Sequence, residues 1–254
     1  MSGPVLRPLS LGEILDVSFG LYRNLFLPLV VVALVTRAVP LAVSVYVQSS
    51  GGMFTNLPLY LGSVILDVVL AAIAAAASTF IVSESYMGRR LTAGDAFRRS
   101  TPFVGRLIAL GILTGLVVML GFLLLIIPGI ILACGLALAT PAMVIESLGS
   151  STEAMGRSWA LTRNFRGKIF VALLVVGVLM YLPFIALGGI AAVSLGAGGV
   201  SGSGAFVGIT GLAALLSSLI WPLFYCVLTV AYYDLRVRKE AFDLEILAAG
   251  LAKT

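Results

Sequence analysis

The sequence contains no histidine and very little charge. Histidine is the commonest general base near neutral pH and the commonest metal ligand, so its absence removes most hydrolytic and metal chemistry from consideration. Only 11% of the 254 residues are charged and the mean hydropathy is +1.14, whereas soluble domains carry about 25% charge. A bilayer penalises charge in its interior. The composition therefore excludes an ordinary soluble domain and predicts an integral membrane protein.

Cysteine and catalytic motifs are equally scarce. Cys134 and Cys226 lie in separate apolar runs, which predicts small core residues rather than a disulfide or a metal site. The sequence has no G-x-x-x-x-G-K loop, no G-x-S-x-G elbow and no H-E-x-x-H motif. We therefore expect no catalytic residue, cofactor or metal site, and we expect that the protein is not an enzyme.

Long apolar runs take up most of the sequence. About 20 mainly apolar residues form a spanning helix. Two runs are interrupted only by Arg37 and Asp67, and the uncharged runs 107–145 and 169–233 are each long enough for two spans. Pro128-Gly129 and the Gly-rich run 196–204 are the predicted turns in these longer runs. The pattern predicts six spans, near 25–47, 57–83, 105–126, 129–147, 168–194 and 205–233.

The distribution of basic residues predicts the orientation of these spans. The junctions 48–56, 127–129 and 195–204 contain no charged residue, and of the 16 basic residues only Arg37 does not fall on the opposite side. Cytoplasmic loops of membrane proteins are enriched in Lys and Arg. We therefore expect a multi-pass protein of the cytoplasmic membrane (the cell inner membrane), with both termini cytoplasmic. The net charge of +5 then faces the inner leaflet, and no nucleic-acid partner is expected.

A short amphipathic segment precedes each pair of spans. Three residues after the Ser or Thr that opens each segment stands an acidic residue, as in a helix capping box, and eight residues after it stands a serine. The aligned positions are Ser10, Thr92 and Ser150, then Glu13, Asp95 and Glu153, then Ser18, Ser100 and Ser158. Amphipathic helices of this kind lie in the headgroup region, and Pro102 is expected to cut the second one short.

These segments predict an all-α fold built from three repeats, each an interfacial helix followed by a transmembrane hairpin. The repeats would cover 10–83, 92–147 and 150–233 within a single membrane domain 1–254 that ends in a cytoplasmic tail, 234–254. Parallel repeats occur in transporters, but duplication also builds inert helical bundles. The repeat alone therefore does not indicate transport.

Arg37 and Asp67 are the charges expected at membrane depth. Each lies ten residues, about 15 Å, from the outer end of its span, so neighbouring antiparallel helices would bring them level. A charge pair facing the bundle interior is tolerated where a single charge is not. The pair either locks two helices in register or serves as an ion relay or an anion contact. We favour the structural role, because a relay generally needs further titratable groups at that depth.

Further charged residues are expected at the cytoplasmic ends of the spans. They are either interfacial anchors and ion pairs, or a polar ring that binds a partner or a lipid headgroup. The acidic members end the even-numbered spans and the basic members begin the odd-numbered spans: Glu84, Glu146 and Asp234, with Arg23, Arg106 and Arg163.

Several short motifs resemble a family of bacterial membrane proteins. They are the opening RPLSLGEILD at 7–16 with Leu21-Tyr22-Arg23, then Pro141 with Glu146, then 157–159 (RSW) and 232–240 (YYDLRVRKE). The family is the glycerophosphoryl diester phosphodiesterase membrane domain, a six-helix module. The resemblance implies the membrane module alone, because the family's hydrolase is a separate barrel domain with catalytic His, which this sequence lacks.

The function predicted from the sequence is that of a noncatalytic membrane module. It would be a scaffold, a partner subunit of a membrane complex or a lipid-interacting protein, with membrane lipids and a protein at the cytoplasmic face as its expected partners. The alternative is a small transporter or channel that uses Arg37 and Asp67. The sequence does not predict an oligomeric state. A continuous polar path through the bundle would favour transport, whereas a dry pair among apolar side chains would count against it.

Overall fold

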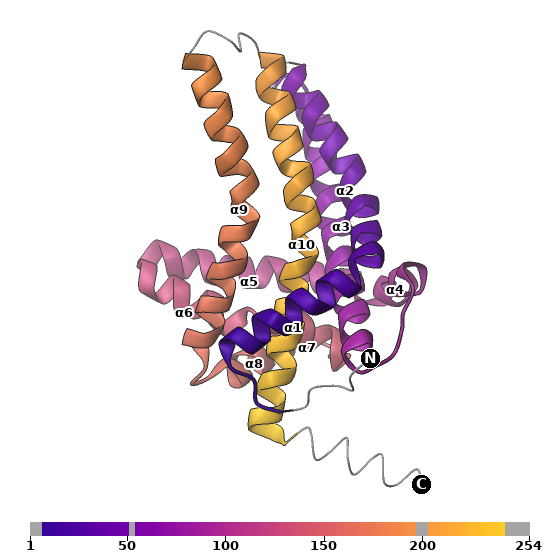
Figure 1. Ribbon diagram of the computed structural model, residues 1–254, viewed down its shortest axis with the longest axis vertical. Coiled ribbons are helices and arrows are strands. Elements are labelled where there is room, and N and C mark those ends of the chain that lie inside the picture. The colour runs from indigo at the N-terminus through magenta and orange to yellow at the C-terminus, as the bar shows by residue number, and fades with distance from the viewer. Residues whose placement is uncertain (1–6, 51–53, 197–202, 242–254) are drawn as a thin grey trace.

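The computed structural model describes residues 7–50, 54–196 and 203–241, and the regular secondary structure of these residues is entirely helical. Two long hairpins run along the axis of the molecule (Figure 1). One pairs α2 (Phe26–Ser49) with α3 (Leu57–Tyr86), and the other pairs α9 (Arg166–Gly196) with α10 (Ser203–Glu240). The connections 51–53 and 197–202 and the tail beyond 241 lie outside the described residues. We call the two pairs the upright hairpins.

Six helical segments of the described chain are long and apolar enough to cross a membrane. The predicted all-α class and the predicted number of such segments are confirmed. The sixth helix continues to Glu240, past the predicted end at 233, because its last turns pack against other helices instead of ending at the membrane surface. The segments are Phe26–Ser49, Leu57–Tyr86, Ala93–Leu124, Ile126–Ile145, Arg166–Gly189 and Gly211–Glu240.

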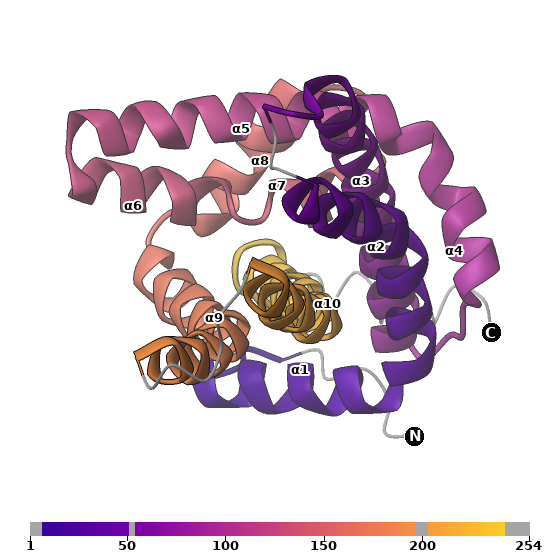
Figure 2. The ribbon, with the colours of Figure 1, turned by 90° about the horizontal axis from the view of Figure 1, so that it is seen from above.

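Helix α10 is the centre of the molecule. Viewed along the axis, it is surrounded by α1, α2, α3 and α9 and by the group of helices from α5 to α8 (Figure 2). Its lower half carries the core: Val230, Tyr232 and Leu235 are almost completely buried, in a cluster that also takes Leu138 of the α6–α7 connection and Leu161 of α8. The upper halves of the upright hairpins instead expose large apolar side chains, as expected of surfaces that meet lipid.

Three short helices follow the capping residues identified in the sequence. They are α1 (Leu11–Asn24), α4 (Ala93–Ser100) and α8 (Ser151–Thr162). Ser10 and Glu13 form a reciprocal capping box, while Thr92 and Ser150 each accept one backbone N–H. Helix α4 is the shortest and passes into a 3₁₀ turn that contains Pro102, as expected of a residue that cannot continue a helix. The three serines at the eighth aligned position, Ser18, Ser100 and Ser158, are all fully buried.

The remaining hairpin, which is the second along the chain, turns at a different residue from the one predicted. Helix α5 (Val104–Leu124) ends at the extended residue Leu125, and α6 (Ile126–Leu136) begins directly after it. Pro128 lies in the first turn of α6, where a backbone N–H has no partner within the helix and its absence costs little. Gly129 faces the ring of Phe122, which lies only 2.4 Å from where a Cβ would stand. The Pro-Gly pair therefore marks the close approach of the two helices and not the turn.

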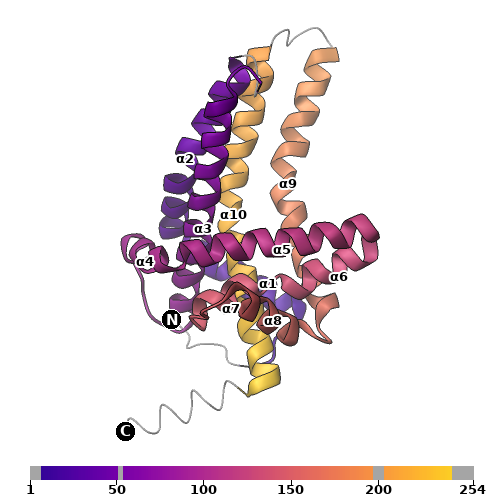
Figure 3. The ribbon, with the colours of Figure 1, turned by 180° about the vertical axis from the view of Figure 1, so that it is seen from behind.

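The α5–α6 hairpin lies across the axis of the upright hairpins. Helix α5 runs across the back of the molecule, and the α5–α6 connection lies beside the lower half of the bundle (Figure 3). The predicted exterior junction at 127–129 is therefore not at the end where α2 and α9 finish. Sequence hydrophobicity sets the length of each helix, but the angle depends on which residues α5 contacts. Leu107 and Leu110 pack on Ala72 and Ala76 of α3.

The fourth predicted span is interrupted. Helix α6 ends at Leu136 and α7 (Ala139–Ile145) begins three residues later. Pro141 has no N–H to offer the carbonyl of the residue four positions earlier, and its ring clashes there. Helix α8 satisfies two other backbone groups at the break, since Ser158 Oγ accepts the N–H of Leu138 at 3.1 Å and donates to the carbonyl of Gly135 at 2.7 Å. The break is therefore a packed feature of the fold.

Candidate functional site

The structure brings Arg37 and Asp67 into contact. Arg37 Nη1 donates to Asp67 Oδ1 at 2.6 Å, from α2 to α3. The two residues lie 12 and 10 positions from the ends of α2 and α3 that face each other, or about 15–18 Å along the axis. That depth is about half the thickness of a bilayer's hydrocarbon core. The pair therefore joins the two helices of the first hairpin well below its outer end.

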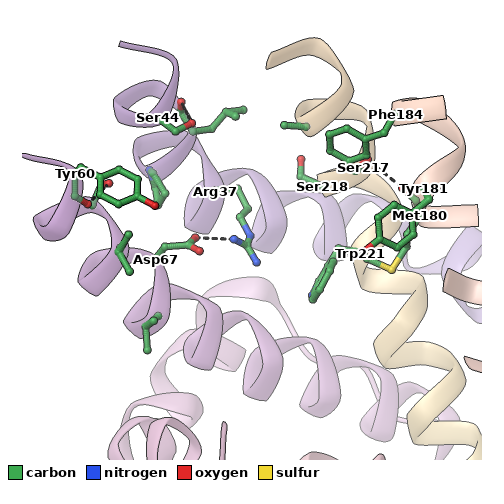
Figure 4. Close-up of a pocket in the computed structure, with 16 residues that line it drawn as sticks. Arg37, Ser44, Tyr60, Asp67, Met180, Tyr181, Phe184, Ser217, Ser218 and Trp221 are labelled. Atoms are coloured by element: carbon green, nitrogen blue, oxygen red, sulfur yellow. Dashed lines mark hydrogen bonds and ion pairs between the residues drawn. The ribbon is translucent and has the colours of Figure 1, made fainter. Parts of the chain in front are cut away.

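The pair lies on the wall of a cavity and not among packed apolar side chains. The cavity has a volume of about 630 Å³ and lies between the two upright hairpins, within the 300–1,000 Å³ range of ligand sites. The guanidinium of Arg37 lies between Asp67 on one side and the indole of Trp221 on the other, with residues of α9 on the far wall (Figure 4). The Arg37 Cζ is 5.6 Å from the centre of the Trp221 ring, a cation–π distance.

Polar and aromatic side chains share this cavity wall with apolar ones. The side chains of Arg37 and Asp67 are 28% and 39% exposed, so neither charge is sealed from the cavity. Four serine hydroxyls and four aromatic rings lie around them, as is typical of a ligand site and not of a dry helix interface. They are Ser44, Ser63, Ser217 and Ser218, with Tyr60, Tyr181, Phe184 and Trp221.

A second polar cluster lies at the opposite, charged end of the molecule, where α7, α8 and the last turns of α10 meet. Arg157 of α8 donates from Nε to both oxygens of Glu146, at 2.9 Å each, and from its Nη atoms to Glu240 of α10. The hydroxyl of Tyr232 donates to Glu146. Hydrogen bonds to Glu240 and then Glu146 raise the pKa of Arg157 above its ordinary value, against the opposing effect of burial. The cluster thus ties α7, α8 and α10 together.

Asp234 of α10 forms a third cluster and is almost fully buried. It accepts the backbone N–H of Leu9 at 2.7 Å, Lys168 Nζ at 2.6 Å and Arg238 Nε at 3.1 Å. Lys168 and Arg238 both donate to the carbonyl of Leu9 as well. A buried carboxylate is stable only when it is paired and hydrogen-bonded in this way. Asp234 therefore fixes the segment before α1 onto α9 and α10.

Glu84 completes the set of acidic residues that were predicted at the ends of the spans. It contacts Arg89 in the loop after α3 and Arg99 of α4, the latter at 3.1 Å. Each predicted acidic residue thus lies where an even-numbered span meets a short helix or the segment before one. Such pairs at a partly exposed end act mainly by fixing positions, because exposed ion pairs contribute little stability.

The predicted basic residues do not pair with these acidic ones. Arg106 donates to the backbone carbonyls of Leu148 and Pro102, and Arg23 and Arg163 are exposed. The acidic residues instead take Arg99, Arg157 and Lys168 as partners. The repeat pattern could have predicted two of these partners, since Arg99 and Arg157 both stand seven residues after the N-cap residue of their short helix. At the same position the first short helix has Val17, and the basic partners of Asp234 come from α9 (Lys168) and from α10 itself (Arg238).

The helices of spanning length, the lipid-facing apolar surfaces and the charged end define a polytopic α-helical membrane protein. No family model matches the chain, and no solved structure matches it. A UPF0259 membrane protein of Pectobacterium carotovorum is 44% identical over 62 residues, which are 24% of this chain and 25% of that protein. The chain thus covers about a quarter of the length of the curated relative that it matches. That relative is a bacterial membrane protein, in agreement with the fold.

The resemblance to the glycerophosphoryl diester phosphodiesterase membrane domain is wrong. The similarity found is to a UPF0259 membrane protein, and no family model of any kind matches. The motifs that suggested the resemblance are two to ten residues long, and apolar sequences match one another easily over such lengths. Several of these residues have local packing roles, since Glu146, Arg157 and Tyr232 belong to one hydrogen-bonded cluster.

Proposed function

We propose that the protein is a noncatalytic membrane protein that holds a membrane lipid in the cavity between its upright hairpins. The observation that carries this proposal is the position of the Arg37–Asp67 pair on the wall of a 630 Å³ cavity that also exposes aromatic rings. A cavity of this size is large enough to hold part of a lipid molecule. A charge pair at that depth gives the cavity a preference for a polar group.

The proposed orientation places the charged end in the cytoplasm of a bacterial cell, with the protein in the cytoplasmic membrane. The excess of Lys and Arg at that end supports this orientation. Both termini would be cytoplasmic, since every hairpin returns the chain to the side on which it began. The absence of His in the sequence supports a noncatalytic role, and a protein partner would bind at the charged end.

Transport of a solute receives less support from the structure. Ser44, Ser63, Ser217 and Ser218 lie on the cavity, but the polar residues that would have to extend the path towards the charged end pack in the core. Thr36 and Thr79 are each about 1% exposed and bond to carbonyls of their own helices. The described polar groups therefore end near the ion pair, as expected of a binding site and not of a channel.

Filling the cavity tests the proposed function. Ala214 lines the cavity on α10, and Ala214→Phe adds a ring to that space. Leu212→Phe changes an exposed side chain two residues away that is not part of the wall. We expect Ala214→Phe, but not Leu212→Phe, to lose the phospholipid that remains bound to detergent-purified protein in native mass spectrometry. Equal lipid retention by both variants and the wild type contradicts the proposal.

A further inference from the structure

The cavity wall offers many more hydrogen-bond acceptors than donors. A serine hydroxyl has one proton and two lone pairs. Ser44, Ser63 and Ser218 donate that proton to carbonyls of their own helices, and Ser217 donates across to the carbonyl of Met180 on α9. With these hydrogen bonds in place, the hydroxyls present lone pairs and not protons to a molecule in the cavity.

The remaining donors on the wall are few. Trp221 Nε1 already donates to the hydroxyl of Tyr225 at 3.1 Å. Arg37 uses Nη1 for Asp67, and a guanidinium carries five N–H groups in all. Apart from the phenol groups of Tyr60 and Tyr181, Arg37 is thus the donor of this wall, and it is the donor that an anion would use.

These groups match a ligand that carries an anion and a primary ammonium close together. The anion would accept from Arg37, while the ammonium would donate to Asp67 and to the serine oxygens. Aromatic rings, which are attracted to cations, surround both positions. Because Arg37 and Asp67 balance each other, a zwitterion leaves the site neutral, whereas a purely anionic or purely cationic ligand leaves a net charge at membrane depth.

We infer that the ligand of this cavity is the headgroup of an ethanolamine phospholipid. This inference rests on the proposed function and adds the chemical class of the lipid. The phosphodiester supplies the anion and the ethanolamine supplies three N–H donors. A choline headgroup is zwitterionic but has no N–H to donate, and a glycerol headgroup has the anion but no cation. The three lipids therefore separate the two features of the site.

Trp221 is a built-in reporter for the test. The chain has two tryptophans, so Trp159→Phe leaves Trp221, on the cavity wall, as the single tryptophan, which is excited selectively at the red edge of its absorption. The protein is placed in vesicles in which the ethanolamine, choline or glycerol phospholipid alone carries brominated acyl chains, which quench tryptophan on contact. The Ala214→Phe background gives the quenching by bulk lipid. We expect the ethanolamine lipid to associate several-fold more strongly than either of the others.

Each outcome has a defined meaning. Equal association of ethanolamine and choline lipids would show that the N–H donors of the ethanolamine ammonium are not recognised. Stronger association of the glycerol lipid would show that the site does not prefer a zwitterionic headgroup. In both cases the proposed function stands if Ala214→Phe still lowers the quenching. If Ala214→Phe quenches like the parent with all three lipids, the proposed function fails too. Displacement of the lipid by free phosphoethanolamine at millimolar concentration would indicate that the ligand is a soluble zwitterion, and the inference that it is a phospholipid would fail.

The uncharged variants Asp67→Asn and Arg37→Gln test which residue binds which part of the headgroup. We expect Asp67→Asn to reduce the preference for ethanolamine over choline, and Arg37→Gln to weaken all three lipids. Far-ultraviolet circular dichroism checks that each variant remains folded. A folded Asp67→Asn protein that keeps the full preference for ethanolamine contradicts the assignment.

A second inference comes from the α5–α6 hairpin, independently of the cavity. We propose that this hairpin lies in the plane of the membrane, within the leaflet nearer the charged end. Its composition and length would allow it to cross a bilayer, but its axis is transverse to the upright hairpins (Figures 1 and 3). No charged residue occurs between Leu107 and Ile145.

The exposure of the hairpin tip fits a site in hydrocarbon. The residues from Leu123 to Ile127 are all between 69% and 80% exposed, far more than water would tolerate in one contiguous patch. At the other end, Arg106 is held by the carbonyls of Leu148 and Pro102, close to the charged end. Helix α5 has 21 residues and α6 has 11, about 30 Å and 16 Å long, so the two lying flat displace roughly 500 Å² of lipid from one leaflet only.

Labelling from outside the cell distinguishes the two arrangements. Phe54, beside the connection of the first upright hairpin, is 83% exposed, and Phe54→Cys is the control for an outer position. Leu125→Cys marks the tip of the α5–α6 hairpin. In spheroplasts, a membrane-impermeant maleimide should label Phe54→Cys and leave Leu125→Cys unlabelled. Labelling of both from outside overturns the in-plane hairpin and means that it crosses. Failure of both to label overturns the proposal as well, because it places the ends of the upright hairpins on the wrong side.

Discussion

Removing the Asp67 carboxylate leaves the Arg37 guanidinium without its partner at membrane depth. Losing one partner of a fully buried pair costs roughly 3–5 kcal/mol, but here the two side chains are 28% and 39% exposed. We therefore expect about 1–3 kcal/mol for Asp67→Ala and a similar loss for Arg37→Ala. For a chain of this size each kcal/mol corresponds to about 2–4 °C in the unfolding temperature.

The double variant separates pairing from the effect of each side chain. With both charges removed, no unpaired charge remains, so Arg37→Ala/Asp67→Ala should be no less stable than the more damaged single variant. Thermal unfolding in one detergent, followed by circular dichroism, gives the coupling energy. Ser44→Ala is the matched control on the same cavity wall and should stay within about 0.5 kcal/mol of the wild type. Additive losses in the double variant would refute the reasoning, because additivity means that the charges do not interact.

Three further changes have defined outcomes. Gly129→Ala places a Cβ against the ring of Phe122, so we expect a lower unfolding temperature, partly restored by Phe122→Leu. Asp234→Asn should leave Lys168 without its anion and lower the unfolding temperature by several degrees, whereas an unchanged value would mean that the buried cluster is dispensable. The hydrogen bond from the Ser10 backbone N–H, followed by that from Arg7, lowers the pKa of Glu13 from 4.5 to about 2, so its contribution to stability is complete above pH 4.5 and is lost as the pH falls towards 2. The difference in unfolding temperature between wild type and Glu13→Gln should accordingly be present at pH 6 and shrink over that interval, and a constant difference would contradict the assignment.

Local sequence signals predicted the elements of this fold well. Helix starts at Ser10, Thr92 and Ser150 were recognisable because a cap depends on residues only a few positions apart. The Arg37–Asp67 contact was predictable because both residues lie at the same depth in consecutive helices. Counting residues within one helix is sufficient for the caps, and counting along two consecutive helices is sufficient for the charge pair.

Features that depend on distant contacts were not predictable in the same way. The transverse orientation of α5 depends on packing against small residues of α3, and periodicity does not report an angle. Asp234 accepts the backbone N–H of Leu9 across 225 positions of sequence. Every residue except proline has a backbone N–H, so the type of residue at position 9 does not indicate this contact. The cavity beside Arg37 required the upright hairpins to be placed relative to each other, since its walls come from α2, α3, α9 and α10.

A density map of the protein in a lipid nanodisc, formed from lipids that include an ethanolamine phospholipid, tests the proposed binding of lipid in the cavity most directly. We expect elongated density between the upright hairpins, ending in a headgroup beside Arg37 and Trp221. Upright hairpins packed directly on each other, with no space or density at that position, would contradict it.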